Sequence, residues 1–244
     1  MTADHATLTD ALLRPVLQVD AARPLVTYYD DATGERVEVS GTTLANWAAK
    51  TANLLRDELG VSPGDRVAVL LPAHWQSVAV YLAVWWCGAV VVVDAPRSGV
   101  HDAAVALCTP DRLGQAEAAP EVAVLSMDAF GRGVDDLPVG VTDYATAVRV
   151  HGDAFAPVAL PGTAPALAER TVAEVLAAAQ DSAAAQGFTP QDRVLSTCEW
   201  DTPAQLVDGL LAVLAAGASL VQVAHADSSR LTHRVETEKV TRVR

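Results

Sequence analysis

The sequence contains an internal repeat that restricts the fold more than any other feature. Gly60-Val-Ser-Pro-Gly-Asp-Arg-Val67 recurs as Gly187-Phe-Thr-Pro-Gln-Asp-Arg-Val194. Further on, Leu82-Ala-Val-Trp-Trp-Cys-Gly-Ala89 is matched by Leu211-Ala-Val-Leu-Ala-Ala-Gly-Ala218. With the helical stretches that precede them, residues 43–93 are repeated at 171–223. A repeat of this kind predicts one supersecondary unit used twice.

The pattern within one unit predicts a parallel βαβ crossover. Residues 67–71 form a short apolar run closed by Pro72, which is typical of a strand buried on both faces. Residues 75–87 have helical length, Gly88 ends them, and residues 89–93 are again rich in valine. Residues 78–93 approach the length of a membrane span, but the break at Gly88 favours a helix followed by a strand. Two strands joined in this way are parallel and their connection is right-handed.

The remaining segments extend this pattern into an α/β protein made of two related parallel-sheet lobes. The first lobe is expected over residues 1–155 with an N-terminal hairpin, the second over 156–244, and the two are expected to pack as one compact unit. The expected elements are helices at 8–22, 44–59, 172–185 and 228–238, a hairpin of 25–29 with 36–40, strands at 103–108, 122–127 and 240–244, and an irregular surface connection at 131–162.

Composition excludes several partners. The chain has a net charge of −13, and nucleic acid or an anionic membrane surface would require a basic patch. Cys87, Cys108 and Cys198 are too few and too scattered for a disulfide framework or a zinc site, so we expect reduced thiols and no metal. The first ten residues carry acids and no apolar core, which favours a cytoplasmic protein over an exported one.

The order of these motifs resembles the N-terminal part of the adenylate-forming enzymes. The resemblance rests on Asn46-Trp-Ala-Ala-Lys-Thr-Ala-Asn-Leu-Leu55, then Gly64-Asp-Arg-Val-Ala-Val-Leu-Leu-Pro72, then the apolar helix and valine strand, and then the second unit. That superfamily includes acyl-CoA synthetases and the adenylation domains of peptide synthetases. It implies the two-lobed scaffold of the family from about residue 27 to the C-terminus.

The chemistry-bearing motifs of the family do not match. Its members carry a Ser/Thr/Gly-rich phosphate loop with a lysine just before the second unit. Here residues 158–168 retain only Gly162 and Thr163 of such a loop, Pro165 removes a donor, and no lysine follows. The later adenine, ribose and C-terminal motifs are not found before Arg244. These absences favour a protein without catalytic residues or a cofactor and lean against an enzyme, but they leave both enzyme activity and residual ATP or AMP binding open.

Three loops at the carboxyl ends of the expected strands are the candidate ligand pocket, because ligands of parallel α/β sheets bind there. The resemblance places an acyl-pocket segment in the last of them. The candidate residues are His74, Trp75, Asp94, Arg97, Glu199, Trp200 and Asp201.

Each candidate also has a structural interpretation. Asp201 or Thr202 before Pro203 is typical of a helix N-cap, and His74 of a helix start. Cys198 has no basic neighbour in sequence that would activate it as a nucleophile. Arg66 and Arg193 each follow an aspartate at a strand entrance, which indicates structural ion pairs or turn contacts.

These observations leave three functional hypotheses. The first is a non-catalytic relative of the adenylate-forming enzymes that binds a small acyl or nucleotide-like ligand or regulates a partner. The second is an assembly protein that forms a homo-oligomer or docks another protein through exposed apolar surface. The third is an acyl-activating ligase half completed by a separate protein.

Overall fold

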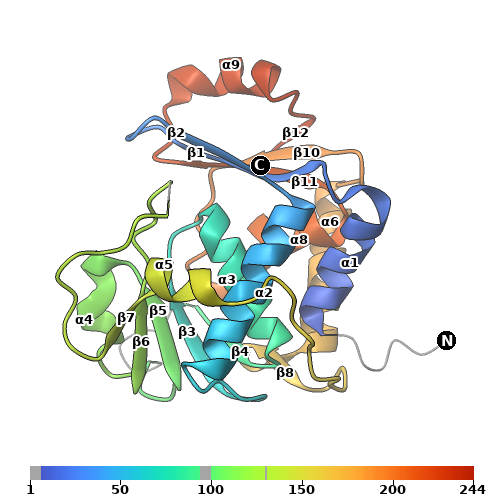
Figure 1. The fold of residues 1–244 in the computed structure, drawn as a ribbon. Helices are drawn as coiled ribbons and strands as arrows, with labels where there is room; N and C mark the ends of the chain where they lie inside the picture. The colour runs from blue at the N-terminus through green and yellow to red at the C-terminus, as the bar shows by residue number, and fades with distance from the viewer. Residues whose placement is uncertain (1–6, 94–99, 130) are drawn as a thin grey trace.

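The chain folds into two β-sheets with a layer of helices between them (Figure 1). The computed structural model describes residues 7–93, 100–129 and 131–244. The five-stranded sheet has the order β12-β10-β11-β1-β2, with strands Arg242–Val243, Arg193–Ser196, Ser219–Ala224, Pro24–Asp30 and Glu35–Ser40. The seven-stranded sheet has the order β7-β6-β5-β3-β4-β8-β9, with strands Val141–Asp143, Glu121–Val124, Val105–Cys108, Arg66–Leu70, Val90–Val92, Pro165–Leu167 and Arg170–Thr171.

Helices lie in three layers, one between the two sheets and one on the far face of each sheet. Between the sheets lies the main core, to which α1, α2, α3, α6, α7 and α8 contribute. On the far face of the seven-stranded sheet, α4 packs against Ala106, Cys108 and Val122. On the far face of the five-stranded sheet, α9 packs against Leu195, Val221 and Val223. The helix bounds are α1 Leu8–Asp20, α2 Gly41–Asp57, α3 Trp75–Trp86, α4 Leu113–Ala116, α5 Tyr144–Ala147, α6 Val172–Gln186, α7 Pro203–Leu206, α8 Ala212–Ala215 and α9 Ser228–Thr237.

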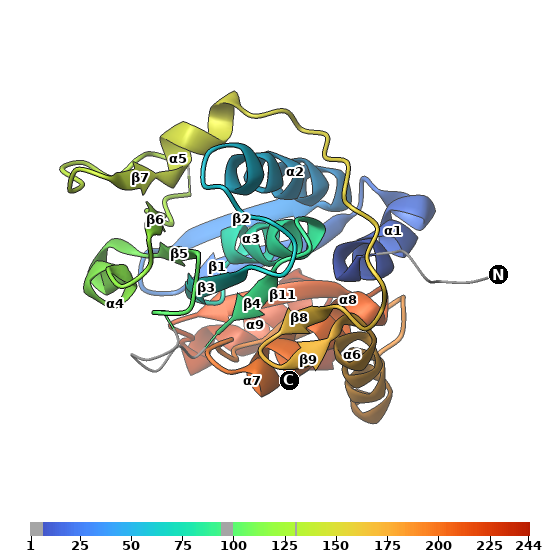
Figure 2. The ribbon, with the colours of Figure 1, turned by 90° about the horizontal axis from the view of Figure 1, so that it is seen from below.

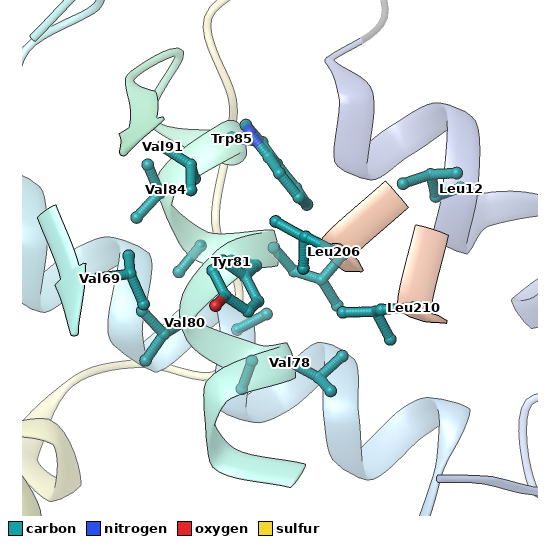
Figure 3. Close-up of a cluster of buried hydrophobic side chains, with 14 of the residues drawn as sticks. Leu12, Val69, Val78, Val80, Tyr81, Val84, Trp85, Val91, Leu206 and Leu210 are labelled. Atoms are coloured by element: carbon teal, nitrogen blue, oxygen red, sulfur yellow. The ribbon is translucent and has the colours of Figure 1, made fainter. Parts of the chain in front are cut away.

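The first predicted crossover, β3-α3-β4, is confirmed. β3 and β4 pair in parallel, with Val67 opposite Val91. Every residue of α3 from Trp75 to Trp85 is buried, so this helix is the centre of the core rather than an amphipathic surface helix (Figure 3). Around it, Tyr81 and Trp85 of α3 face Leu206, Leu210 and Leu12 from the second unit and from α1. In the part of the chain that the structure describes, no helix is both long enough and apolar enough to span a bilayer.

The second unit repeats the first, with one irregularity. α6 precedes β10, and β10 pairs in parallel with β11 through Val194 opposite Leu220. The helix between them is interrupted by a π-helical turn at Val207–Leu211, which separates α7 from α8. An ideal Cβ on Gly209 would lie 3.1 Å from Nε1 of Trp200, so glycine at this turn admits the indole of the preceding loop.

The sheets do not follow the predicted division of the chain at residue 155. The N-terminal hairpin, assigned to the first lobe, is part of the five-stranded sheet with the second unit, because β1 pairs in parallel with β11. Conversely, β8 follows residue 155 but pairs with β4 of the seven-stranded sheet. Each sheet therefore contains strands from both sides of that boundary, and one continuous core joins them.

The irregular connection at 131–162 contains β7, α5 and a 3₁₀ turn at Val148–Val150 before it crosses to β8. Its last part runs along the outside of α2 (Figure 2). Lys50 donates to the carbonyl of His151 at 2.6 Å, and Asn53 donates to the carbonyls of Gly152 and Ala154. The indole of Trp86 stacks on Phe155, with ring centroids 6.3 Å apart.

Candidate functional site

His74 lies in the seam between the two sheets, and its geometry gives it a structural role. It is the N-cap of α3, where Nδ1 accepts the backbone N–H of Gln76 at 3.2 Å. An accepting Nδ1 requires the proton to be on Nε2. Nε2 faces Oε1 of Glu35 at 3.6 Å, and both atoms are buried. Burial lowers the pKa of His74, although Glu35 opposes that shift. A neutral imidazole whose free lone pair caps a helix is not available as a general base.

Tyr28 connects this histidine to the five-stranded sheet. Its ring meets the imidazole of His74 edge to face, with centroids 4.2 Å apart. Burial raises the pKa of Tyr28, and the negative charges of Asp30, Glu35 and Glu199 raise it further. The loops after β3 and β10 therefore converge on the carboxyl end of β1, as the parallel topology predicts. Tyr28 was not singled out in the sequence, because its role depends on the hairpin joining the second unit.

Trp200 was predicted as a pocket wall but is packed inside the protein. It is 1% exposed and its ring lies 6.2 Å from that of Tyr81 in α3. Its neighbours Glu199 and Asp201 are exposed. Burial raises the pKa of Tyr81, and Asp201 adds to that shift. The loop thus brings an indole into the core and leaves two carboxylates at the surface.

The two alternatives for the cap after Trp200 are resolved by the hydrogen bonds. Thr202 is the N-cap of α7, and its side chain accepts the N–H of Gln205 at 3.2 Å. Gln205 completes a capping box by accepting the N–H of Thr202 at 3.0 Å. The structural interpretation is therefore correct, with Thr202 rather than Asp201 as the capping residue.

The remaining predicted pocket residues are separated or lie outside the described chain. Asp94 and Arg97 belong to residues 94–99, which the structure does not describe. Trp75 is buried at the start of α3, 5.7 Å from the ring of Trp47. It lines a pocket of about 400 Å³ that also involves β2, α2 and the turn after α5. No sequence motif marks that pocket, since its walls come from five separate segments.

The segment predicted as a degenerate phosphate loop lies in a turn just before a hairpin. Gly162 and Thr163 lie in a turn closed by the N–H of Ala164 and the carbonyl of Pro161. Two residues, 168 and 169, then join β8 to the antiparallel β9. α6 begins at once, and its first N–H groups are already used: Val172 donates to Ala164, and Ala173 donates to Gly162.

A carboxylate also occupies the N-terminus of α6. Glu174 accepts the N–H of Thr171 at 2.9 Å and its hydroxyl at 2.8 Å. These hydrogen bonds lower the pKa of Glu174, so its negative charge is fixed where a helix attracts anions. A phosphate placed there would meet a carboxylate rather than free backbone donors.

Arg66 and Arg193 make the structural ion pairs predicted for them. Arg66 pairs with Glu169 at 3.2 Å, and Arg193 pairs with the buried carboxylate of Glu238. The aspartate before each arginine closes the same turn: Asp65 accepts the N–H of Ser62 at 2.8 Å, and Asp192 accepts that of Thr189 at 2.7 Å.

The cysteines show no arrangement for catalysis or metal binding. Burial raises the pKa of Cys87 to about 12 and that of Cys108 to about 11, so neither provides a thiolate near neutral pH. Cys198 is partly exposed, and its N–H bonds to the hydroxyl of Ser196. Within residues 7–93, 100–129 and 131–244, no three His, Cys, Asp or Glu side chains come together as a metal site.

Comparison with known proteins identifies relatives of this chain. The family model described as "AMP-binding enzyme" matches residues 17–109. A "TIGR03089 family protein" of Mycobacterium tuberculosis is 59% identical over 97% of this chain and 98% of its own length. An acetyl-coenzyme A synthetase of Coprinopsis cinerea is 40% identical over 27% of this chain and 10% of its own length.

Among solved structures, the fold matches an anthranilate CoA ligase in complex with anthranoyl-AMP at a TM-score of 0.80, with 16% identity over 99% of this chain and 50% of that one. It matches an acyl-CoA synthetase of Brucella canis at 0.81, with 19% identity over 98% of this chain and 47% of that one. The chain thus spans about half the length of the ligases that share its fold. It belongs to the TIGR03089 family, its residues 17–109 match the AMP-binding enzyme model, and its fold is that of about half of these ligases.

Proposed function

We propose that this protein binds an acyl-type ligand on the adenylate-forming scaffold without activating it with ATP. The observation that carries the proposal is the occupied N-terminus of α6. A hairpin with a two-residue turn precedes α6, where the family has its phosphate loop. The first N–H groups of α6 donate to protein carbonyls, and the carboxylate of Glu174 lies at this positively polarised end of the helix. Lysine is also scarce: the chain contains only Lys50 and Lys239, and neither adjoins this turn in sequence.

Physical chemistry makes ATP binding at this turn unfavourable. A triphosphate requires several free backbone donors and at least one cation, and it is repelled by a neighbouring carboxylate. An acyl ligand has no such requirement, since apolar contacts and one or two polar groups fix it. A scaffold retained without its phosphate site is therefore suited to binding the acyl portion of a ligand.

The test combines thermal unfolding with an activity assay. The protein is heated with Mg-ATP, AMP, coenzyme A, carboxylic acids and non-hydrolysable acyl-adenylate analogues, and ATP–pyrophosphate exchange is measured with the same acids. Ligand at about 100 times its dissociation constant adds about 2.7 kcal/mol, which raises Tm by a few degrees. We expect a shift with carboxylic acids and no shift or exchange with ATP. A shift with Mg-ATP, or any acid-dependent exchange, overturns the proposal.

A second candidate function, assembly, is favoured by an apolar groove between α1 and the turn that follows α8. The groove has a volume of about 300 Å³, and its lining residues include Leu12, Val16, Val19 and Leu214. Val19 is 82% exposed, which is unusual for a valine beside other apolar side chains. If this face joins two copies, light scattering will show a dimer that the Val19→Asp variant loses. A monomer at all concentrations removes this candidate.

A further inference from the structure

A pocket between the hairpin and α2 combines aromatic walls with two cations. It is formed where β2, α2, the start of α3, the residues Ala129 and Gly131, and the turn after α5 meet, and the chain that follows α5 crosses α2 (Figure 1). Its volume is about 400 Å³, within the usual range for small-molecule sites. The residues that matter for the argument are Val37, Val39, Trp47, Trp75, Lys50 and Arg149.

The apolar part of the pocket is made by two indoles and two valines. Trp47 and Trp75 stand nearly perpendicular, with an interplanar angle of 73° and centroids 5.7 Å apart. Val37 and Val39 point from the same face of β2, because residues two apart share a face. An aromatic ligand placed here would gain edge-to-face contacts that a flexible chain does not.

The polar part of the pocket has one sign of charge. Lys50 and Arg149 line it, and no carboxylate is among its described lining residues, although acids outnumber bases in this chain by 30 to 17. Lys50 is one of two lysines in the sequence, and its ammonium makes one hydrogen bond, to the carbonyl of His151. Arg149 donates to the carbonyl of Gly131. Each cation therefore retains donors for a further acceptor.

One polar atom of the wall is unpartnered. The indole nitrogen of Trp75 is buried and has no hydrogen-bond acceptor among the described residues. A buried N–H of this kind costs free energy unless a ligand or water supplies the acceptor. Because this nitrogen has no exposed surface, the polar partners offered to a ligand in the pocket are Lys50 and Arg149.

We propose that this pocket binds a compact aromatic monocarboxylate, with the ring against Trp47 and Trp75 and the carboxylate between Lys50 and Arg149. The inference rests on the proposed ligand-binding function and gives it a place and a ligand class. It requires no nucleotide. It also distinguishes an aromatic acid from a linear fatty acid, because the two indoles favour a rigid ring over a chain that loses rotational freedom.

The first experiment compares matched ligands. Binding of 3-phenylpropionate is measured by calorimetry and by tryptophan fluorescence, with the uncharged 3-phenylpropanamide and linear octanoate as comparisons. We expect the aromatic acid to bind at least about tenfold more tightly than its amide, because charge-assisted hydrogen bonds to Lys50 and Arg149 are lost in the amide. Equal binding of acid and amide overturns the proposal, and so does the absence of binding by the acid.

The second experiment uses variants. Lys50→Met and Arg149→Met keep an unbranched side chain and remove the charge, and each is expected to weaken 3-phenylpropionate about tenfold. Lys239→Met, in the exposed turn after α9, is the matched control and is expected to bind normally. Circular dichroism and Tm establish that each variant is folded. Unchanged affinity in both pocket variants overturns the proposal.

A third measurement uses the scarcity of lysine. Brief acetylation of the wild-type protein is read by mass spectrometry, with and without 3-phenylpropionate. Protection of Lys50 but not of Lys239 supports the site, and equal labelling of both in the presence of saturating ligand overturns it. If an acid or acyl-adenylate analogue stabilises wild type and Lys50→Met equally, the ligand-binding function stands and this pocket is not its site.

Discussion

The imidazole of His74 faces the carboxylate of Glu35 at 3.6 Å across the seam between the two sheets. One residue comes from the loop after β3 of the seven-stranded sheet, and the other begins β2 of the five-stranded sheet. The opposite nitrogen of the imidazole caps α3. This histidine therefore joins the two sheets and starts the central helix.

The buried state of His74 predicts a pH dependence of stability. Burial lowers the pKa of His74 in the folded protein from its ordinary value of 6.5. The unfolded chain then binds more protons at acidic pH, so the free energy of unfolding falls as pH falls from about 6.5 through the folded-state pKa. Urea unfolding between pH 5 and 8 measures this slope. The His74→Asn variant keeps a capping acceptor, and its unfolding free energy should depend less on pH than that of the wild type. An unchanged pH dependence would show that other groups cause it.

Glu238 is the second ionisable group with a clear prediction. Burial opposes its ionisation, but hydrogen bonds from Tyr29, Arg193 and Arg36 outweigh burial and lower the pKa of Glu238 to about 2. The ionised carboxylate of Glu238 therefore contributes fully to the free energy of unfolding above pH 4.5, and this contribution is lost as pH falls toward 2. Glu238→Gln should lower the free energy of unfolding at pH 7 by about 2–4 kcal/mol, because two arginines lose their carboxylate. Glu236→Gln, on the exposed side of α9, is the control and should change it by less than about 0.5 kcal/mol.

Alanine substitutions at Gly88 and Gly60 distinguish the free-energy cost of backbone strain from that of steric crowding. Both have positive φ, 73° and 70°, so alanine at either position carries a conformational cost of about 1 kcal/mol. A Cβ at Gly60 would meet nothing within 4 Å, whereas one at Gly88 would lie 2.5 Å from Leu160 and 3.3 Å from Pro63. We expect Gly88→Ala to be about 1 kcal/mol more destabilising than Gly60→Ala in chemical denaturation. Equal losses would show that Leu160 moves aside freely.

The cap of α7 gives a prediction that separates two adjacent residues. Thr202→Ala removes the acceptor for the N–H of Gln205 and should cost about 1 kcal/mol of stability. Asp201→Ala removes an exposed side chain that does not cap the helix, and its effect should stay within about 0.5 kcal/mol. Both are measured by urea unfolding at pH 7. A larger loss in Asp201→Ala would move the cap to that residue.

The thiols should react in an order set by burial. Cys87 and Cys108 are buried and their pKa values are raised, while Cys198 is partly exposed. A maleimide added to the native protein at pH 7 should modify Cys198 first and the other two only after unfolding. Peptide mass spectrometry identifies the modified residue. Early labelling of Cys87 would indicate that the core around α3 opens readily.

Local structure was predictable because its signals are local. The apolar run before Pro72 predicts a strand, and Gly88 predicts the end of a helix. The turn residues between Tyr29 and Arg36 predict a hairpin, and none of these signals depends on distant residues. The sheet that the hairpin joins was not predictable in this way. Its β1 pairs with β11 through backbone hydrogen bonds, which leave no mark on residue type.

The site was predicted less well than the fold, for a related reason. His74 and Trp200 were singled out as residues at strand ends, and both are at strand ends, but whether such a side chain points into solvent or into the core depends on the elements opposite it. Trp200 turns inward because Gly209 leaves room for its indole. The aromatic pocket has no contiguous motif; the rarity of lysine was the one sequence signal that could have drawn attention to Lys50.

The pairing of β1 with β11 also bears on how the protein is made. The hairpin is synthesised well before β11, the strand that completes its parallel edge. At a synthesis rate of about 5–20 residues per second, the nascent hairpin waits roughly 10–40 s with one edge unpaired. Such an edge readily accepts a strand from a neighbouring chain. Until β11 has been made, nascent chains of this protein are therefore open to strand pairing with one another.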